Sequence, residues 1–126
     1  MFEDEVFFHQ SGSTHRTFAK IGTGTIVKSE PVKRCIKALG AVSDEQNPSF
    51  YFKFAPVFNQ ETFFLFLKKL VKRYAGKKIF MILDNVRYHH ARTIKEWLEE
   101  NSEKIELHFL PPYSPNLNPI EKVWKK

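Results

Sequence analysis

The strongest constraint on the fold of this chain is a change in the spacing of its apolar residues near position 59. Before that position, short runs of alternating residues are separated by turn-forming residues, a pattern typical of antiparallel strands. After it, apolar residues recur at helical spacing and are interleaved with short apolar runs, which indicates alternating helices and strands. The chain is therefore expected to begin as an antiparallel meander and to continue as strand–helix–strand units.

The first half of the sequence predicts four short strands. They are expected at residues 2–9, 15–21, 34–42 and 49–55, with the last of them at an edge of the sheet. Turns are expected at residues 10–14 and at Gly22–Gly24, where small and polar residues gather.

The second half predicts helices and strands in alternation. Apolar residues from 59 to 74 follow a helical period, and Gly76 stands where a helix commonly ends. Ile79–Leu83 is a short apolar run, typical of a strand that is buried on both faces. A helix at 91–100, a strand at 104–109 and a helix that begins at Asn118 complete the order.

This order predicts an α/β fold. Strand–helix–strand units imply parallel pairing with right-handed crossovers. Together with the meander, they give a mixed sheet flanked by helices. A chain of 126 residues is long enough for one such domain with a core of its own.

Composition narrows the class of protein. The net charge of +6 favours a polyanionic partner, of which nucleic acid is the commonest. The single Cys35 excludes an internal disulfide. No apolar run is long enough to span a membrane, and the acidic N-terminus is unlike a signal peptide, so no membrane partner is expected. A chain that opens directly on a strand is expected to be a domain cut from a longer protein.

The first candidate site residue, Asp84, follows the predicted strand Ile79–Leu83 directly. In open α/β sheets, ligands bind at the carboxyl ends of the strands. The alternative is that Asp84 or Asn85 only caps the next helix or fixes a turn.

The second candidate, Asp4, lies inside the first predicted strand. Alternation places it with apolar residues, whereas Glu3 and Glu5 share the more polar side. A carboxylate on an apolar face needs a reason, such as a metal ion. The alternative is a solvated acidic strand end.

The third candidate, Glu121, lies in the run Asn118-Pro119-Ile120-Glu121. This run fits N-cap, N1, N2 and N3 of a helix, so Glu121 has the position of the capping-box glutamate. Taken alone, Glu121 is interpreted as a capping residue. The helix that follows is short and is expected to be marginal without packing.

Taken together, the three carboxylates predict a metal site. Two divalent ions about 3.5–4 Å apart activate a hydroxyl or water and stabilise the leaving oxygen of a phosphodiester. Mg²⁺ prefers hard oxygen ligands, and two or three carboxylates are enough to hold it.

Five strings carry these residues and cover nearly the whole chain: FEDEVFF, HRTFAKIG, ALGAV, MILDNVRYHHA and LPPYSPNLNPIEKVW. In this order they resemble the catalytic domain of DDE transposases, in particular the mariner-like superfamily and its bacterial and archaeal insertion-sequence relatives. The last string, a proline-rich loop followed by Asn-Pro-Ile-Glu and a Trp, is the most specific. Phe18 stands where the family often has Trp.

The resemblance implies a single ribonuclease-H-like DDE catalytic domain over residues 1–126. It implies that Asp4, Asp84 and Glu121 are the catalytic metal ligands, holding two Mg²⁺ ions with Mn²⁺ as a substitute. Family members also carry an N-terminal helix-turn-helix region. We expect the present domain to lack it and to be truncated at the C-terminal helix.

The activity implied is metal-dependent DNA cleavage at transposon ends, followed by transfer of the freed 3′-hydroxyl to target DNA. The implied partners are double-stranded DNA, as transposon end and as target, and a second copy of the chain in a homodimer. No small-molecule substrate is expected. A prokaryotic, cytoplasmic location at the nucleoid follows from the same resemblance.

Two further residues are accessory candidates, Asn85 and His89. A His stands at the position of His89 in the family, so this residue is expected near the metal ions or the DNA. The alternative is a hydrogen-bonding role at a helix start. A zinc site at His89 and His90 is rejected, because no further Cys or His stands at zinc spacing.

Basic residues are candidates for DNA contact. Those near the expected site in sequence are Arg87, Arg92, Lys122, Lys125 and Lys126. Lys68 and Lys72 belong to the densest basic cluster, for which a solvated helix face is the favoured interpretation. Tyr113 and Trp124 are candidates for stacking on bases, with packing as the alternative.

Two other functions stay open. One is a catalytically inactive transposase remnant that binds DNA or dimerises, which the missing N-terminal region and the short last helix favour. The other is a different ribonuclease-H-like nuclease, such as a structure-selective nuclease or an RNA–DNA hybrid hydrolase. The segment from Asn118 to Glu121 argues against the second, because it is particular to the transposase resemblance.

Overall fold

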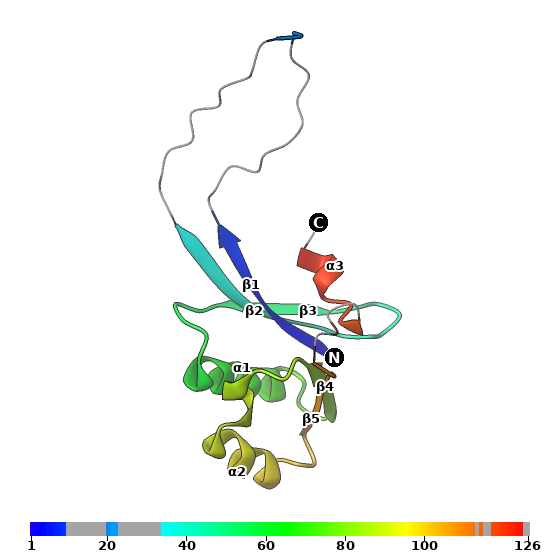
Figure 1. Cartoon of the computed structure of the whole chain (residues 1–126). Helices are drawn as coiled ribbons and strands as arrows, with labels where there is room; N and C mark the ends of the chain where they lie inside the picture. The colour runs from blue at the N-terminus through cyan, green and yellow to red at the C-terminus, as the bar shows by residue number, and fades with distance from the viewer. Residues whose placement is uncertain (10–19, 23–33, 113, 115–116, 125–126) are drawn as a thin grey trace.

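The structure is a computed structural model that describes residues 1–9, 20–22, 34–112, 114 and 117–124 (Figure 1). In these ranges a single mixed sheet carries helices on both faces. The elements are β1 (Phe2–His9), β2 (Cys35–Val42), β3 (Phe50–Phe54), α1 (Gln60–Arg73), β4 (Ile79–Leu83), the 3-10 helix η1 (Arg87–His90), α2 (Arg92–Glu100), β5 (Ile105–Phe109) and α3 (Glu121–Trp124).

The strands lie in the order β3-β2-β1-β4-β5. β2 pairs with β1 and with β3 in antiparallel fashion, whereas β4 pairs with β1 and with β5 in parallel. The predicted mixed sheet is therefore confirmed, and β3 lies at an edge as expected. β1 is the central strand and joins the antiparallel half to the parallel half.

One predicted strand, at 15–21, lies mostly outside the described residues, as do Phe18 and the turn predicted at 10–14. Within the described part, Ile21 and Gly22 form a turn rather than a strand. Gly22 has a φ of 86°, a left-handed conformation that favours glycine. The start of the predicted Gly22–Gly24 turn is therefore present.

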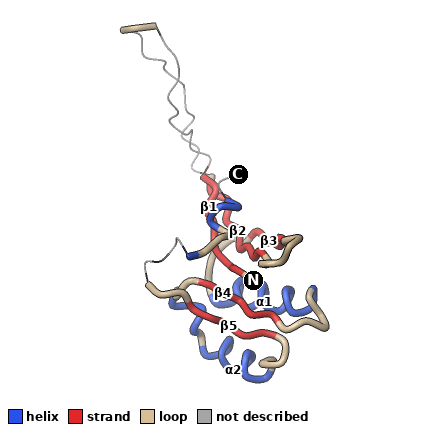
Figure 2. The backbone as a smooth tube through the Cα atoms, turned by 90° about the vertical axis from the view of Figure 1, so that its right-hand side faces the viewer, coloured by secondary structure: helices blue, strands red, loops and turns tan. Residues whose placement is uncertain are grey.

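The main core lies between the sheet and α1. The buried side chains of α1 are Phe63, Phe66, Leu67 and Leu70, and α2 adds Ile94. In Figure 1, α1 and α2 lie below β3 and α3 lies above it. Figure 2 shows β4 and β5 side by side, next to α1 and α2. Among the described helices, none has the length and apolar character needed to cross a membrane.

Burial along β4 differs from the prediction. Ile79, Met81 and Leu83 are buried in the core, but Phe80 is 52% exposed. The prediction of a strand buried on both faces is therefore wrong for this strand. The reason is that α1 and α2 pack on the face of Met81, while Phe80 points to the opposite face.

The N-terminus of α1 provides a first prediction. Asn59 Oδ1 accepts hydrogen bonds from the backbone N–H groups of Glu61 and Thr62, at 3.1 and 3.0 Å. Asn59→Ala should lower the free energy of unfolding by about 1 kcal/mol, because both donors lose their acceptor. Urea unfolding measures this change. Asn59→Asp keeps the acceptor and serves as the control; an equal loss in both variants would contradict the capping role.

Candidate active site

The pairing of β1 with β4 brings Asp4 and Asp84 together. Phe2 of β1 lies opposite Ile82 of β4 in the parallel register. Asp4 and Asp84 each follow two residues later, so they leave the sheet on the same face and at the same level. Asp84 comes directly after the end of β4, as the sequence predicted.

A cavity of about 360 Å³ opens at this edge of the sheet. Asp4, Asp84 and Glu121 all contribute to its wall, although they come from β1, from the end of β4 and from α3. The remaining lining residues are Asn85, Val86, Leu110, Pro111, Pro112, Ser114 and Asn118. The structure thus brings together the three carboxylates that the sequence analysis singled out.

Asp4 lies in a partly buried, electronegative environment. Burial raises the pKa of its carboxyl to about 6, and the carboxylates of Glu121 and Glu5 add to the rise. Hydrogen bonds from the Glu5 backbone and from the Trp124 side chain lower the pKa without cancelling the rise. Asp4 is therefore not the solvated strand end that was the alternative interpretation.

α3 is held against β1 at its start. The Asn118 side chain donates from Nδ2 to the carbonyl oxygen of Glu3 at 2.9 Å, and Ile120 is fully buried. Asn118 Oδ1 accepts from the backbone N–H of Ile120 at 3.4 Å. Within the described residues, no hydrogen bond joins the Glu121 carboxylate to the Asn118 backbone, so the reciprocal half of the expected capping box is not formed. The Glu121 side chain contributes to the cavity instead.

The far end of α3 is tied to the same strand through Trp124. Its indole Nε1 donates to Asp4 Oδ2 at 3.0 Å. Gly40 of β2 lies opposite Asp4 in the register, and a Cβ at this glycine would meet the indole at 2.3 Å. The absence of a side chain at position 40 therefore makes room for Trp124, which in turn orients Asp4.

His89 lies in the core rather than at the surface. It is 1% exposed, and its ring packs on Phe63 with centroids 4.1 Å apart. Its Nδ1 donates to the carbonyl oxygen of Asp84 at 3.2 Å. His89 is thus close to Asp84, but its burial separates it from a DNA surface.

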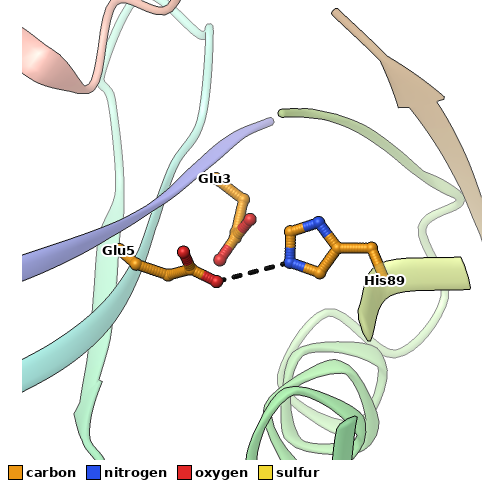
Figure 3. Close-up of side chains that lie close together, drawn as sticks. All are labelled: Glu3, Glu5 and His89. Carbon is orange, nitrogen blue, oxygen red and sulfur yellow. Dashed lines mark ion pairs between the residues drawn. The ribbon is translucent and has the colours of Figure 1, made fainter. Parts of the chain in front are cut away.

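Two acidic residues were misplaced by the sequence pattern. Glu3 and Glu5 were assigned to the more polar side of β1, yet Glu3 is 1% exposed. Both side chains point toward His89 (Figure 3). The pattern could not show this, because the residue that faces them is distant in sequence and belongs to η1.

The other predicted residues are spread over the molecule. Asn85 lines the cavity and accepts a hydrogen bond from His90. Arg87 and Lys122 are exposed on η1 and α3, next to the cavity residues in sequence. Arg92 is paired with Glu96 at 2.6 Å.

On α1, the Nζ of Lys68 lies 4.0 Å from the centre of the Phe64 ring, and Lys72 is exposed. α1 and α3 lie on opposite faces of the sheet, so these two lysines are on the far side from Glu121 (Figure 1). Lys125, Lys126 and Tyr113 lie outside the described residues.

Sequence reasoning missed the supporting roles of Gly40, Asn118 and Trp124 at this site. Asn118 had been read only as a helix cap, and Trp124 as a stacking or packing residue. The short interval between Glu121 and Trp124 was the available signal, since residues three apart lie on the same side of a helix.

The donor set of the cavity fits divalent metal ions. Three carboxylates are hard oxygen ligands of the kind that Mg²⁺ and Mn²⁺ prefer. The raised pKa of Asp4 reflects burial first, and then repulsion from the carboxylates of Glu121 and Glu5. A bound cation would remove that repulsion and favour the ionised forms.

The sequence matches a known protein family along its whole length. A family model described as DDE superfamily endonuclease matches residues 1–126. A curated relative, the insertion element IS630 uncharacterized 39 kDa protein of Shigella sonnei, is 38% identical over 64 residues, which cover 50% of this chain and 18% of the relative. The match thus spans less than a fifth of that protein.

Solved structures share the fold. The Mos1 transposase paired-end complex with left transposon end is similar with a TM-score of 0.68 and 17% identity, over 96% of this chain and 38% of the other. The Mos1 mariner paired-end complex with Mn has a TM-score of 0.60 and 20% identity, over 94% of this chain and 37% of the other. At these identities the likeness shows the fold alone, a ribonuclease-H-like mixed sheet.

The fit between Gly40 and Trp124 leads to a second prediction. Gly40→Ala should lower the free energy of unfolding by about 1–3 kcal/mol, because the new methyl group forces the indole to move. In a Trp124→Leu background the same substitution should cost much less. Urea unfolding of the four proteins in this double-mutant cycle measures the coupling. An equal cost in both backgrounds would mean that Gly40 does not make room for Trp124.

The raised pKa of Asp4 leads to a third prediction. Between pH 3.8, the ordinary pKa, and about 6, the folded state binds more protons than the unfolded state. The free energy of unfolding of the metal-free protein should therefore fall as the pH rises through this window. Asp4→Asn should remove this contribution and stabilise the protein near neutral pH by about 1–2 kcal/mol, a figure reduced for partial exposure.

Urea unfolding in EDTA across this pH range, for wild type and Asp4→Asn, tests the prediction. The pKa of Glu3 is also raised, first by burial and then by the carboxylates of Glu5, Asp4 and Asp84. The part due to burial and to Glu5 and Asp84 is common to both proteins, and the part due to Asp4 is lost together with the Asp4 contribution. If the free energy of unfolding changes with pH in the same way for both proteins, the pKa of Asp4 is not raised.

Proposed function

Because this chain belongs to the DDE superfamily of endonucleases, we propose that it is the catalytic domain of a transposase. It cleaves DNA at transposon ends and transfers the freed 3′-hydroxyl to target DNA. The observation that carries the proposal is the meeting of Asp4, Asp84 and Glu121 in one cavity, from three separate elements.

The three carboxylates would hold two Mg²⁺ ions, with Mn²⁺ as a substitute. Bound ions would supply activation of water or a 3′-hydroxyl and stabilisation of the leaving oxygen. The Mos1 transposase, which has been solved with Mn, supports a metal-dependent reaction for the shared fold.

The chain's own residues have distinct roles in this proposal. Asp84 is half exposed and meets the solvent side of the cavity, so it is accessible to DNA. Asp4 is partly buried and oriented by the indole N–H of Trp124. Glu121 is fixed by the packing of Ile120 and the hydrogen bond of Asn118 to β1. Asn85 and His89 are accessory: one lines the cavity, and the other holds the Asp84 carbonyl.

The partner is double-stranded DNA, as transposon end and as target. The net charge of +6 favours a polyanion. Arg87 and Lys122 are the best placed contacts, since both are exposed and follow cavity residues closely in sequence.

The reaction joins two ends, so the working form is a homodimer. A curated relative of this chain, the protein of Shigella sonnei, is from a bacterium, which supports a prokaryotic chromosome as the place of action.

Residues 1–126 correspond to the catalytic part of a transposase in this proposal. The chain covers 38% of the Mos1 chain whose fold it shares. Recognition of the terminal repeats is therefore assigned to parts of such proteins that lie beyond this domain.

Plasmid nicking tests the proposed function. With Mn²⁺, the protein should nick supercoiled plasmid, and Asp84→Asn should reduce the rate by at least about 100-fold, because it removes a metal ligand. Asp44→Asn is the matched control, since Asp44 is exposed and away from the cavity. Its rate should equal that of wild type.

Equal nicking by wild type and Asp84→Asn would indicate a contaminating nuclease and sink the assignment of this site. Metal-dependent DNA binding without any nicking would instead favour the inactive remnant that acts as a binding module.

A further inference from the structure

A second cluster of ligand-type side chains lies on the other face of β1. Glu3, Glu5 and His89 each offer one ligand atom, and these atoms all lie within 4.8 Å of one another. Figure 3 shows the two carboxylates of β1 directed at the imidazole ring of η1. The three residues are close together only in the folded chain, because β1 and η1 are far apart in sequence.

The polar atoms of this cluster have no hydrogen-bond partners among the described residues. Both carboxylate oxygens of Glu3, Oε1 of Glu5 and Nε2 of His89 are buried without one. Glu3 and His89 are each 1% exposed. Buried polar atoms without partners are rare in folded proteins and costly. Four such atoms facing one another therefore point to a missing ligand.

The hydrogen bonding of His89 fixes its tautomer. Nδ1 lies 3.2 Å from the carbonyl oxygen of Asp84, which can only accept, so Nδ1 carries the proton. In the neutral imidazole Nε2 then presents a lone pair to the cluster, where it faces Glu5 Oε1, the contact drawn as a dashed line in Figure 3. A histidine held by its other nitrogen on a backbone carbonyl is the usual arrangement of a metal-binding imidazole.

The distances suit a small transition-metal ion. Nε2 of His89 and Oε1 of Glu5 lie 3.4 Å apart. This is close to the edge of a tetrahedron with bonds of about 2.0–2.1 Å, the lengths that zinc makes with nitrogen and oxygen. A Glu3 carboxylate oxygen, within 4.8 Å of both atoms, is the third ligand of the set.

We propose that Glu3, Glu5 and His89 form a second cation site, which binds one divalent transition-metal ion of the Zn²⁺ class. The ion joins β1 to η1 and thereby fixes the backbone on which Asp4 and Asp84 stand. It is separate from the cavity ions, because alternation along β1 directs Asp4 to the opposite face. The inference does not depend on the proposed function.

A proton is the main alternative occupant. Burial and the carboxylates of Glu5, Asp4 and Asp84 raise the pKa of Glu3 well above its usual range. A proton on Nε2 of His89 would pair this nitrogen with Glu5 Oε1, but a proton on Glu3 would still leave the second oxygen of Glu3 without a partner. A cation would satisfy all three residues at once, because their ligand atoms lie within 4.8 Å of one another.

The proposal is tested by titrating Zn²⁺ into the full chain that carries Asp4→Asn and Glu121→Gln. These two changes remove two of the three carboxylates of the cavity, so that Zn²⁺ binding there is weakened. Calorimetry should show one Zn²⁺ per chain, and Co²⁺ should give the visible absorption of a low-coordinate nitrogen–oxygen site. Adding Glu5→Gln or His89→Gln should weaken binding by at least about 10–100-fold. Zn²⁺ at a hundredfold excess over its dissociation constant should raise Tm by about 10 °C, and only when these ligands are present.

His108→Gln is the matched control. His108 is exposed, and its Nε2 lies 3.2 Å from a Glu106 oxygen. It is thus another His–Glu pair, and no third ligand joins it among the residues that the structure describes. Its loss should leave Zn²⁺ binding unchanged. Circular dichroism in EDTA checks that the variants fold. If His89→Gln does not fold, the milder change Glu5→Gln carries the test. The proposal is overturned if the cavity variant binds no Zn²⁺, or if Glu5→Gln binds it as tightly as His108→Gln does.

Discussion

The central strand β1 carries three consecutive carboxylates, and the rest of the structure depends on how these charges are accommodated. Asp4 faces α3 and the cavity, whereas Glu3 and Glu5 face α1 and His89. A strand in the middle of a sheet cannot solvate its side chains freely, so each face needs donors or cations. The Trp124 indole meets part of this need on one face, and the proposed metal ions meet the remainder on both.

The same strand also organises α3. The four-residue helix is too short to be stable by itself. It is held because Asn118 bonds to the β1 backbone at one end and Trp124 bonds to Asp4 at the other. Gly40 on the neighbouring strand leaves the space for the indole. The position of Glu121 is therefore set by these tertiary contacts with β1.

The sequence was sufficient for the elements whose cause is local. The helical period of α1, the apolar run of β4 and the strand-end position of Asp84 follow from residues next to one another, and the structure agrees with them. The sequence was insufficient where a residue packs against a partner that is distant along the chain. The burial of Glu3 depends on His89, and the exposure of Phe80 depends on which face of the sheet α1 and α2 cover. The family resemblance supplied the grouping of Asp4, Asp84 and Glu121, which spacing along the chain does not contain.

The central claim is that Asp4, Asp84 and Glu121 form one metal-binding centre at the edge of the sheet. Anomalous diffraction from crystals grown with Mn²⁺ tests it most directly, because the signal locates the ion independently of any activity. Anomalous density is expected inside the cavity that Asp4, Asp84 and Glu121 line, and it should disappear in crystals of Asp84→Asn. Crystals that show all three carboxylates ordered and no anomalous density between them would contradict it.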